Sequence, residues 1–152
     1  MEKKIKNYII RHLFNFFPAY RSTGGRVIYI SQNWQEVHVK LKLSWKTRNY
    51  YGTLYGGSLY GAIDPIYVIM LLQILGDEYI IWNKSSNINF LIPGNTTLYA
   101  YAKIKDSEIK SIKNELVYKP KIDKIYTINL VDSNGLVYAV TQQIINIRKK
   151  DK

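Results

Sequence analysis

Residues 55–65 read YGGSLYGAIDP and open the most apolar segment of the chain. Two glycines begin a pattern that predicts one helix over residues 57–76, with Gly76 as its C-terminal cap. The second half of that segment, IYVIMLLQIL, is apolar on almost every face. A helix of this kind is typically enclosed by other structure on all sides. The segment therefore predicts the central helix of a domain.

A carboxylate and a proline, Asp64 and Pro65, stand in the middle of this predicted helix. Pro65 has no N–H to donate to the carbonyl of Gly61 and its ring would clash there, so we expect a kink or break between the two. Asp64 has two interpretations. It could form hydrogen bonds with backbone groups that the kink leaves without partners. Alternatively, the kink could direct its side chain out of the core and into a pocket, where an unpaired carboxylate can take part in a reaction.

On both sides of the helix the pattern changes to strands. Residues 36–45, EVHVKLKLSW, alternate strictly between apolar and polar side chains, which is typical of a half-buried antiparallel strand. Asn134-Gly135 between two alternating runs is a strong hairpin signal. Residues 107–123 are charged and less regular, so no element is predicted there. The other predicted strands cover 26–30, 79–93, 96–106, 124–132 and 136–147.

The predicted order is a helix, two strands, a loop, the apolar helix and about four strands. We therefore expect an α+β fold in which one antiparallel sheet wraps around one central apolar helix, in a single domain over residues 1–152. Residues 1–18 form a predicted N-terminal amphipathic helix ending before Pro18, with an apolar stripe at Ile5, Ile9, Leu13 and Phe17. It packs on its own domain or lies on a membrane surface. Residues 148–152 are a basic tail.

Composition narrows the chemistry. The chain has 152 residues and no cysteine, which excludes disulfides, cysteine nucleophiles and thiolate metal sites, and agrees with a cytoplasmic location. Two scattered histidines do not suggest zinc, so no metal is expected. The net charge is +11, from 22 Lys+Arg against 11 Asp+Glu. Such a surface attracts nucleic acid, anionic lipid or phosphorylated ligands. No nucleic-acid motif accompanies the charge, and no specific nucleic acid is expected.

The motif around the glycine pair resembles the hotdog-fold thioesterase superfamily, above all the phenylacetate-degradation type and an uncharacterised thioesterase-like branch. In that family an Asn is followed six residues later by His-Gly-Gly, and an acid stands nine positions after the His. Here Asn49, Tyr55-Gly56-Gly57 and Asp64 have the same spacing, with Tyr55 in place of the His. The later segment IIWNKSSNINFLIPG also resembles the branch, and the likeness covers roughly residues 18–147.

The resemblance implies a hotdog fold and hydrolysis of acyl-CoA, with no cofactor beyond the coenzyme A thioester that is the substrate. Asp64 is then the general base for water, and N–H groups at the helix N-terminus near Gly57 stabilise the oxyanion, assisted by Asn49. Expected substrate contacts are Tyr55, Gly56, Tyr60 and Tyr67 for the acyl thioester, and Lys119, Lys121 and Lys124 for the phosphates.

The resemblance also implies a homodimer or a dimer of dimers with sites between subunits. Gly57 of one subunit then faces Asp64 of the other. Two further functions stay open at this point. One is a non-catalytic acyl or lipid binder that lost turnover together with the His. The other is a basic module that binds a membrane surface or nucleic acid.

Overall fold

The computed structural model describes the backbone of residues 2–150 and the side chains from Tyr8 onward. The helices in this range are α1 (Glu2–Phe16), α2 (Pro18–Ser22), α3 (Gly56–Ile63), α4 (Ile66–Leu75) and α5 (Asp106–Tyr118). The strands are β1 (Gly25–Ile30), β2 (Glu36–Leu41), β3 (Tyr79–Phe90), β4 (Leu98–Lys103), β5 (Lys121–Val131) and β6 (Val137–Lys149).

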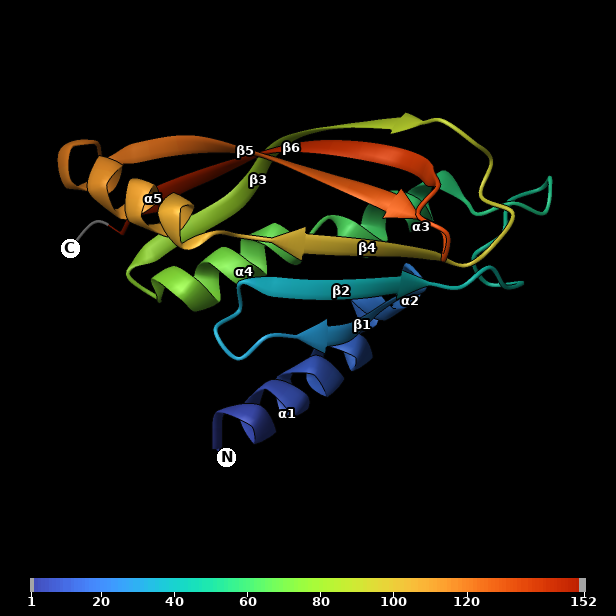
Figure 1. Cartoon of the computed structure of the whole chain (residues 1–152), viewed down its shortest axis with the longest axis horizontal. Coiled ribbons are helices and arrows are strands. Elements are labelled where there is room, and N and C mark those ends of the chain that lie inside the picture. The colour runs from blue at the N-terminus through green and yellow to red at the C-terminus, as the bar shows by residue number, and fades with distance from the viewer. Residues whose placement is uncertain (1, 151–152) are drawn as a thin grey trace.

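The six strands form one antiparallel sheet in the order β1-β2-β4-β5-β6-β3. The sheet curls around α3 and α4, which lie in its concave face (Figure 1). The predicted architecture, an antiparallel sheet around a central apolar helix with a helix at the N-terminus, is confirmed. β1 and β3 are the two edges of the sheet, and β3 joins it only through β6.

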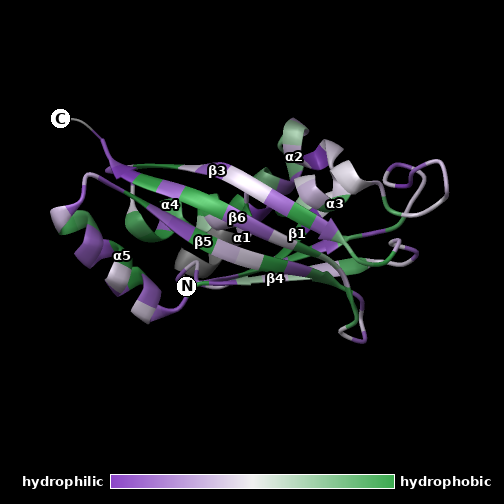
Figure 2. Ribbon diagram, turned by 90° about the horizontal axis from the view of Figure 1, so that it is seen from above, coloured by the Kyte–Doolittle hydropathy of each residue, from purple (hydrophilic) through white to green (hydrophobic). Residues whose placement is uncertain are grey.

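The hairpin of β5 and β6 forms where Asn134-Gly135 predicted it, and Gly135 has the positive φ of 86° that such a turn requires. Hydrophobic and hydrophilic residues alternate along these strands in Figure 2. The inward side chains of β6 pack on the central helix, because a strand turns every second residue to the same face. They include the fully buried Ile145 and Ile147.

The central helix buries one face and leaves another partly open. Ile63, Tyr67, Met70 and Leu71 are buried in the core. On a neighbouring face, Val68 is only half-buried. The expectation that this helix is enclosed on all sides is therefore wrong for a single chain. By length and composition alone, residues 56–75 could cross a membrane. The core helix of a soluble domain meets the same criteria, and this helix lies in the concave face of the sheet.

Helix α1 packs on its own domain, as expected, but with a different face. The amide of Asn15 pairs with β1 like a strand, donating to the carbonyl of Val27 at 2.8 Å and accepting from its N–H at 2.8 Å. Arg11 donates to the carbonyl of Ile28 at 2.7 Å. Helix α1 therefore occupies the outer edge of β1. The predicted stripe is exposed at Ile9, Leu13 and Phe17, and the side chain of Ile5 lies outside the described residues.

Helix α5 occupies most of the segment for which no element was predicted. Its N-terminus is stabilised by Glu108, which accepts a hydrogen bond of 3.1 Å from the N–H of Lys105. Ile109, Ile112 and Leu116 recur at helical spacing and pack into the core. This spacing of apolar residues indicates a helix, but the many charged residues between them hid the pattern in the sequence. At the other end of the chain, Arg148 and Lys149 belong to β6, so the described part of the basic tail begins as a strand.

Candidate active site

The central helix breaks where the sequence predicted. The N–H of Asp64 donates to the carbonyl of Tyr60 at 2.9 Å, and Pro65 has no N–H to continue the series. Pro65 adopts φ −82° and ψ −7°, and α4 begins at the next residue. Asp64 is thus the last residue associated with α3, and its side chain is half-buried rather than enclosed.

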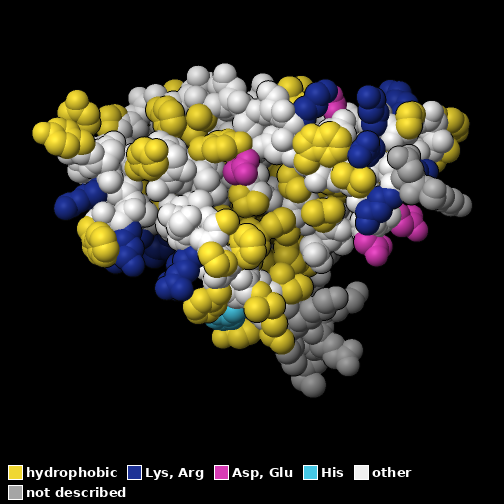
Figure 3. Space-filling model, turned by 180° about the vertical axis from the view of Figure 1, so that it is seen from behind, with side chains coloured by type: hydrophobic (Ala, Val, Ile, Leu, Met, Phe, Trp, Pro, Cys, Tyr) yellow, Lys and Arg dark blue, Asp and Glu magenta, His cyan; other side chains and the backbone are white. Residues whose placement is uncertain are grey.

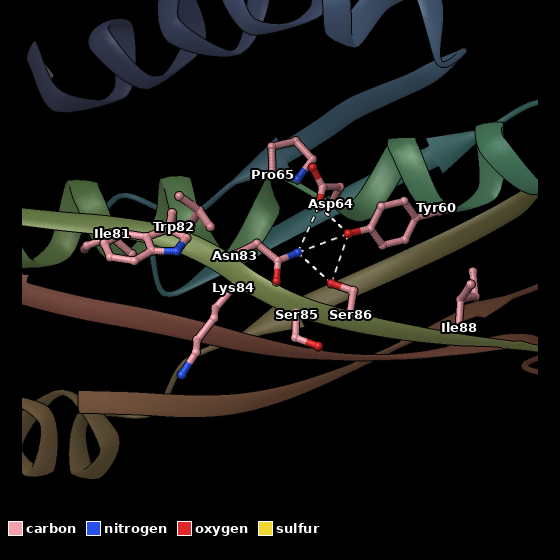
Figure 4. A pocket seen from close by; sticks show the side chains of 11 residues that line it. Tyr60, Asp64, Pro65, Ile81, Trp82, Asn83, Lys84, Ser85, Ser86 and Ile88 are labelled. Carbon is pink, nitrogen blue, oxygen red and sulfur yellow. Dashed lines mark hydrogen bonds between the residues drawn. The ribbon is translucent and has the colours of Figure 1, made fainter. Parts of the chain in front are cut away.

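Asp64 opens into a hollow of about 700 Å³ between the central helix and β3. Tyr60, Asp64, Pro65 and Val68 line it from the helix side. Residues 81–86 and Ile88 line it from β3 (Figure 4). Residues 60, 64 and 68 are spaced at one turn each, so they form one face of the helix, and this is the face that the core does not cover.

Four polar side chains meet at the base of this hollow (Figure 4). The hydroxyl of Tyr60 donates to Oδ1 of Asp64 at 2.6 Å, and Nδ2 of Asn83 donates to the same oxygen at 2.9 Å. The hydroxyl of Ser86 lies 2.9 Å from that of Tyr60 and 2.7 Å from Nδ2 of Asn83. Among the described residues none donates to Oδ2 of Asp64. One carboxylate oxygen is therefore held in place, and the other is free of donors from the described residues.

A β-bulge in β3 brings Asn83 and Ser86 to the same side. Asn83 pairs with Ile145 and Ser85 pairs with Ile144, so Lys84 is the extra residue. Without the bulge, residues three apart would point to opposite faces of the sheet. With it, both side chains reach Tyr60 and Asp64. Sequence analysis did not identify Asn83 or Ser86, and its only signal was the irregular alternation of WNKSSN.

Electrostatics keep Tyr60 in the donor form. Burial, followed by the hydrogen bond to Asp64 and the charge of its carboxylate, raises the pKa of the Tyr60 phenol. The hydroxyl therefore stays protonated at neutral pH and continues to donate to the carboxylate.

The glycine pair lies at the start of α3, as predicted, under two aromatic rings. A Cβ on Gly57 would lie 2.4 Å from Cε1 of Tyr55, and one on Gly56 would lie 3.1 Å from Cζ of Phe90. Tyr55 is the N-cap residue, makes no side-chain capping bond, and is 58% exposed. Its ring therefore covers the helix N-terminus that the sequence predicted as the oxyanion site.

Two of the predicted site residues have other roles within one chain. Asn49 shapes its own loop: its Oδ1 accepts from the N–H of Tyr51 at 3.0 Å and its Nδ2 donates to Thr53 at 3.0 Å. It does not line the hollow around Asp64. Tyr67 is 4% exposed and stacks on Tyr126 with ring centroids 4.3 Å apart. The expectation that Tyr67 contacts substrate is corrected, because its ring belongs to the core.

The three lysines expected to bind phosphates do not form one group. Lys119 lies 3.9 Å from a carboxylate oxygen of Glu115, and Lys124 forms a close ion pair with the same residue. The hydrogen bond from Lys124 is the largest of the effects that lower the pKa of Glu115. Lys121 is separate from these two lysines and lines a second hollow on the other side of β3. Within residues 2–150, no group of three or more His, Cys, Asp or Glu side chains could hold a metal ion.

A family model described as "Domain of unknown function (DUF4442)" matches residues 6–145. No curated protein matches the sequence. Among solved structures, PA5026 from Pseudomonas aeruginosa, a protein of unknown function designated "probable thioesterase", superposes with a TM-score of 0.83 at 18% identity. That alignment covers 95% of this chain and 96% of the other.

Two further structures carry more definite names. The thioesterase HI1161 from Haemophilus influenzae gives a TM-score of 0.69 at 12% identity and covers 92% of this chain and 88% of its own. The E. coli PaaI protein from the phenylacetic acid degradation operon gives a TM-score of 0.65 at 16% identity. That alignment covers 99% of this chain and 95% of the PaaI chain. At such identities the likeness shows the fold alone, and it confirms the hotdog fold that the motif implied.

Proposed function

The chain belongs to the DUF4442 family, and we propose that it hydrolyses acyl thioesters of coenzyme A, with Asp64 as the general base. One observation carries the proposal. A carboxylate stands at a break in the central helix, one of its oxygens is held by Tyr60 and Asn83, and it opens into a hollow of about 700 Å³. A purely structural Asp64 would not need this opening or a free oxygen.

The reaction needs only water and the thioester. Oδ2 of Asp64 accepts a proton from water as the water oxygen bonds to the thioester carbonyl carbon, and the carbonyl oxygen becomes an oxyanion. Collapse of this tetrahedral intermediate breaks the carbon–sulfur bond. The departing thiolate takes the proton back from Asp64, which leaves the acid and the free thiol. Tyr60 and Asn83 keep the carboxylate oriented throughout.

The oxyanion donors come from a second copy of the chain. Gly57 and Asp64 are separated by seven residues, or roughly 10 Å along a helix axis. The free N–H groups at a helix N-terminus point away from its C-terminal end. A carbonyl held at Gly57 therefore lies still farther from Asp64 of the same chain. A complete site combines Asp64 of one subunit with Gly57 of its partner.

The two sheet edges support a pairing of copies through β3. The outer edge of β1 is occupied by Asn15 and Arg11 of α1. β3 has 12 residues and, among the described elements, pairs only with β6. A long open edge beside exposed apolar surface is a site for strand pairing. Figure 3 shows apolar side chains gathered across the middle of the face seen from behind Figure 1. A second copy would cover this surface.

The lining of the hollow favours a fatty or aryl acyl group. Val68, Ile81, Trp82 and Ile88 supply apolar side chains around the polar cluster. Burying the acyl group against them is favourable at about 25 cal/mol per Å² of apolar surface. A sugar or a small acid would gain little from such a lining.

Release of free thiol from a series of short-chain, long-chain and aromatic acyl-CoAs tests the proposal. We expect turnover by the wild type, and a loss of about 10²–10⁴ in kcat for Asp64→Asn, with acyl-CoA binding retained. Asp77→Asn is the matched control, since Asp77 is exposed and does not line the hollow. Equal turnover by the wild type and Asp64→Asn would exclude Asp64 as the base.

A second candidate, a non-catalytic acyl binder, is favoured by one feature. The ring of Tyr55 lies against Gly57, where an oxyanion would otherwise approach the helix N-terminus. If the wild type binds acyl-CoA but releases no thiol, while Tyr55→His restores release, this alternative describes the natural protein better.

A further inference from the structure

Helix α1 has two apolar faces. Ile10 and Phe14 lie one turn apart and pack against the core of the domain. A second face is open to solvent, and its large apolar side chains, each 50–66% exposed, recur at helical spacing: Ile9, Leu13 and Phe16 of the helix and Phe17 directly after it. We call these four residues the outer stripe. A helix needs only one apolar face to pack on its own domain, so the outer stripe calls for a different contact.

The proposed pairing of copies through β3 leaves the outer stripe uncovered. The sheet has β1 at one edge and β3 at the other, and α1 lies at the β1 edge (Figure 1). The polar side of α1 is the side that meets the strand, through Asn15 and Arg11. A copy that pairs with β3 therefore lies across the sheet from the stripe.

The chain around the outer stripe carries charge of one sign. Residues 3–35 contain six Lys+Arg and no Asp or Glu, so this segment alone supplies +6 of the net charge of +11. One of these cations adjoins the stripe directly, because the exposed guanidinium of Arg21 lies 5.7 Å from the ring centroid of Phe16. A surface that combines large apolar side chains with unpaired positive charge suits a partner that is both apolar and anionic.

A second copy of the chain does not have this chemistry. Two copies joined face to face by a two-fold axis bring the same patch of each chain together. The cations of residues 3–35 would then lie near their own copies, and the segment holds no carboxylate to pair with them. The surface of an anionic bilayer supplies both requirements, because its phosphates attract Lys and Arg while its hydrocarbon receives Phe, Leu and Ile.

We propose that α1 binds the surface of an anionic phospholipid bilayer, with the outer stripe inserted among the acyl chains and Arg21 at the level of the phosphates. Helix α1 has 15 residues, fewer than the ~20 that cross a bilayer, and it lies in the plane of the surface. The inference goes beyond the proposed function, since binding involves neither Asp64 nor turnover.

Sedimentation of the full chain with lipid vesicles tests the outer stripe. The wild type should bind vesicles of phosphatidylcholine mixed with phosphatidylglycerol about tenfold or more tightly than vesicles of phosphatidylcholine alone, and added salt should weaken this binding. Leu13→Gln/Phe17→Gln should lower the partition coefficient by about tenfold or more, because less apolar surface enters the bilayer. A wild type that binds neither vesicle, or both equally, overturns the proposal.

A matched double variant keeps this test specific. Val117→Gln/Tyr118→Gln removes exposed apolar side chains from the end of α5, and its partition coefficient should stay within about twofold of the wild type. Equal losses in the two double variants would overturn the role of α1. All four residues are exposed, so equal thermal midpoints are expected and verify that both variants fold.

Single charge changes test the orientation of the helix. Arg21→Gln should lower the affinity for the anionic vesicles by roughly fivefold. Lys110→Gln removes the same charge from an exposed position on α5 and should change the affinity by less than about twofold. Equal losses in both would assign binding to net charge alone and overturn the placement of Arg21 at the phosphates.

A fluorescent label distinguishes the bilayer from other partners of the stripe. The chain has no cysteine, so Leu13→Cys introduces a single site for an environment-sensitive dye. Its emission should shift to shorter wavelength when anionic vesicles are added, whereas the same dye at Val117→Cys should not shift. Vesicle binding without a shift at residue 13 means that another surface meets the bilayer. A larger assembly of the wild type that Leu13→Gln/Phe17→Gln abolishes, with no vesicle binding by either, makes the stripe a contact between copies. Both results overturn the proposal.

Discussion

The hydroxyl of Tyr60 donates a hydrogen bond of 2.6 Å to Oδ1 of Asp64, one helical turn further along α3. Asp64 is the C-cap residue of α3 and also directly precedes Pro65, the N-cap of α4, so it lies between the negative end of one helix dipole and the positive end of the next. Tyr60 and Asn83 both donate to Oδ1 and hold the carboxylate in place. The carboxylate is therefore positioned by two dedicated donors and stands before an open hollow.

Replacing Tyr60 with phenylalanine should lower kcat by about fivefold, because the carboxylate loses one of its two orienting donors, worth roughly 1 kcal/mol. Tyr67→Phe is the matched control. It removes a hydroxyl from the next helix, α4, but one that donates to the carbonyl of Thr127 at 3.3 Å in the core. Thiol-release kinetics of both variants measure the difference. A loss of activity in Tyr67→Phe alone would contradict the placement of the site.

Asp64→Asn should leave the free energy of unfolding unchanged or raise it by up to about 1 kcal/mol, because a charge is removed from a half-buried position while Oδ1 remains an acceptor for Tyr60 and Asn83. Asp64→Ala should lower it by about 1 kcal/mol, since Tyr60 and Asn83 lose their acceptor. Denaturant unfolding of both variants measures the two effects. If Asp64→Asn is strongly destabilised yet fully active per folded molecule, the carboxylate is structural.

A site shared between subunits predicts complementation. Asp64→Asn removes the base, and Gly57→Val places a side chain where Tyr55 and the substrate approach the helix N-terminus. Each variant alone should be inactive. The two variants are unfolded together in equal amounts and refolded, so that half of the dimers contain one chain of each kind. Each mixed dimer has one site with both Asp64 and Gly57 intact and one site with neither. About a quarter of the wild-type number of active sites should therefore be recovered. A site contained in one chain would recover nothing.

Alkaline pH should unfold the protein through its buried tyrosines. Burial raises the pKa of Tyr20, Tyr67 and Tyr126. Because the unfolded chain then loses these protons first, at about pH 10, their contribution is complete below that pH and is lost as pH rises toward the folded pKa values. The thermal midpoint should therefore be nearly constant from pH 7 to about 9 and fall above about 10.

Two tyrosine variants separate the contributions to this alkaline fall. Tyr126→Phe should not be destabilised at neutral pH, since its hydroxyl is buried without a partner among the described residues. Tyr20→Phe should lose about 1 kcal/mol there, because its hydroxyl donates to the carbonyl of Ala62 at 2.9 Å. Each substitution should reduce the decrease of the thermal midpoint at alkaline pH. If this decrease is the same in both variants and the wild type, other ionising groups cause it.

Gly25→Ala should destabilise the fold by about 1–3 kcal/mol, through crowding where β1 meets α3. A Cβ at residue 25 would lie 2.7 Å from Cβ and 2.9 Å from Cα of Ala62, which is backbone and cannot rotate away. Gly61→Ala is the comparison at a similar distance. Its new Cβ would lie 2.7 Å from Cγ2 and 3.2 Å from Cβ of Thr23, which are side-chain rather than backbone atoms, and alanine favours the helix, so a smaller loss is expected. Equal stability of the two variants would contradict this packing.

The sequence by itself determined the elements whose side chains repeat with the period of a strand or a helix. The apolar run 66–75 and the alternation along β2, β5 and β6 predicted a sheet around a central helix, because burial selects one face at each period. Pro65 predicted the helix break for an equally local reason, its missing N–H. Helix α5 was missed because its apolar positions, such as Ile112 and Leu116, are outnumbered by charges.

Only the tertiary structure decided which polar groups meet. Asn83 and Ser86 reach Asp64 because the bulge at Lys84 shifts the register against β6, and register depends on a partner strand more than 50 residues away. Tyr60 and Tyr67 look alike in the sequence, yet one faces the hollow and the other stacks on Tyr126. Lys121 and Arg148 oppose each other only through strand pairing. Contacts between distant residues follow from packing, which no local pattern encodes.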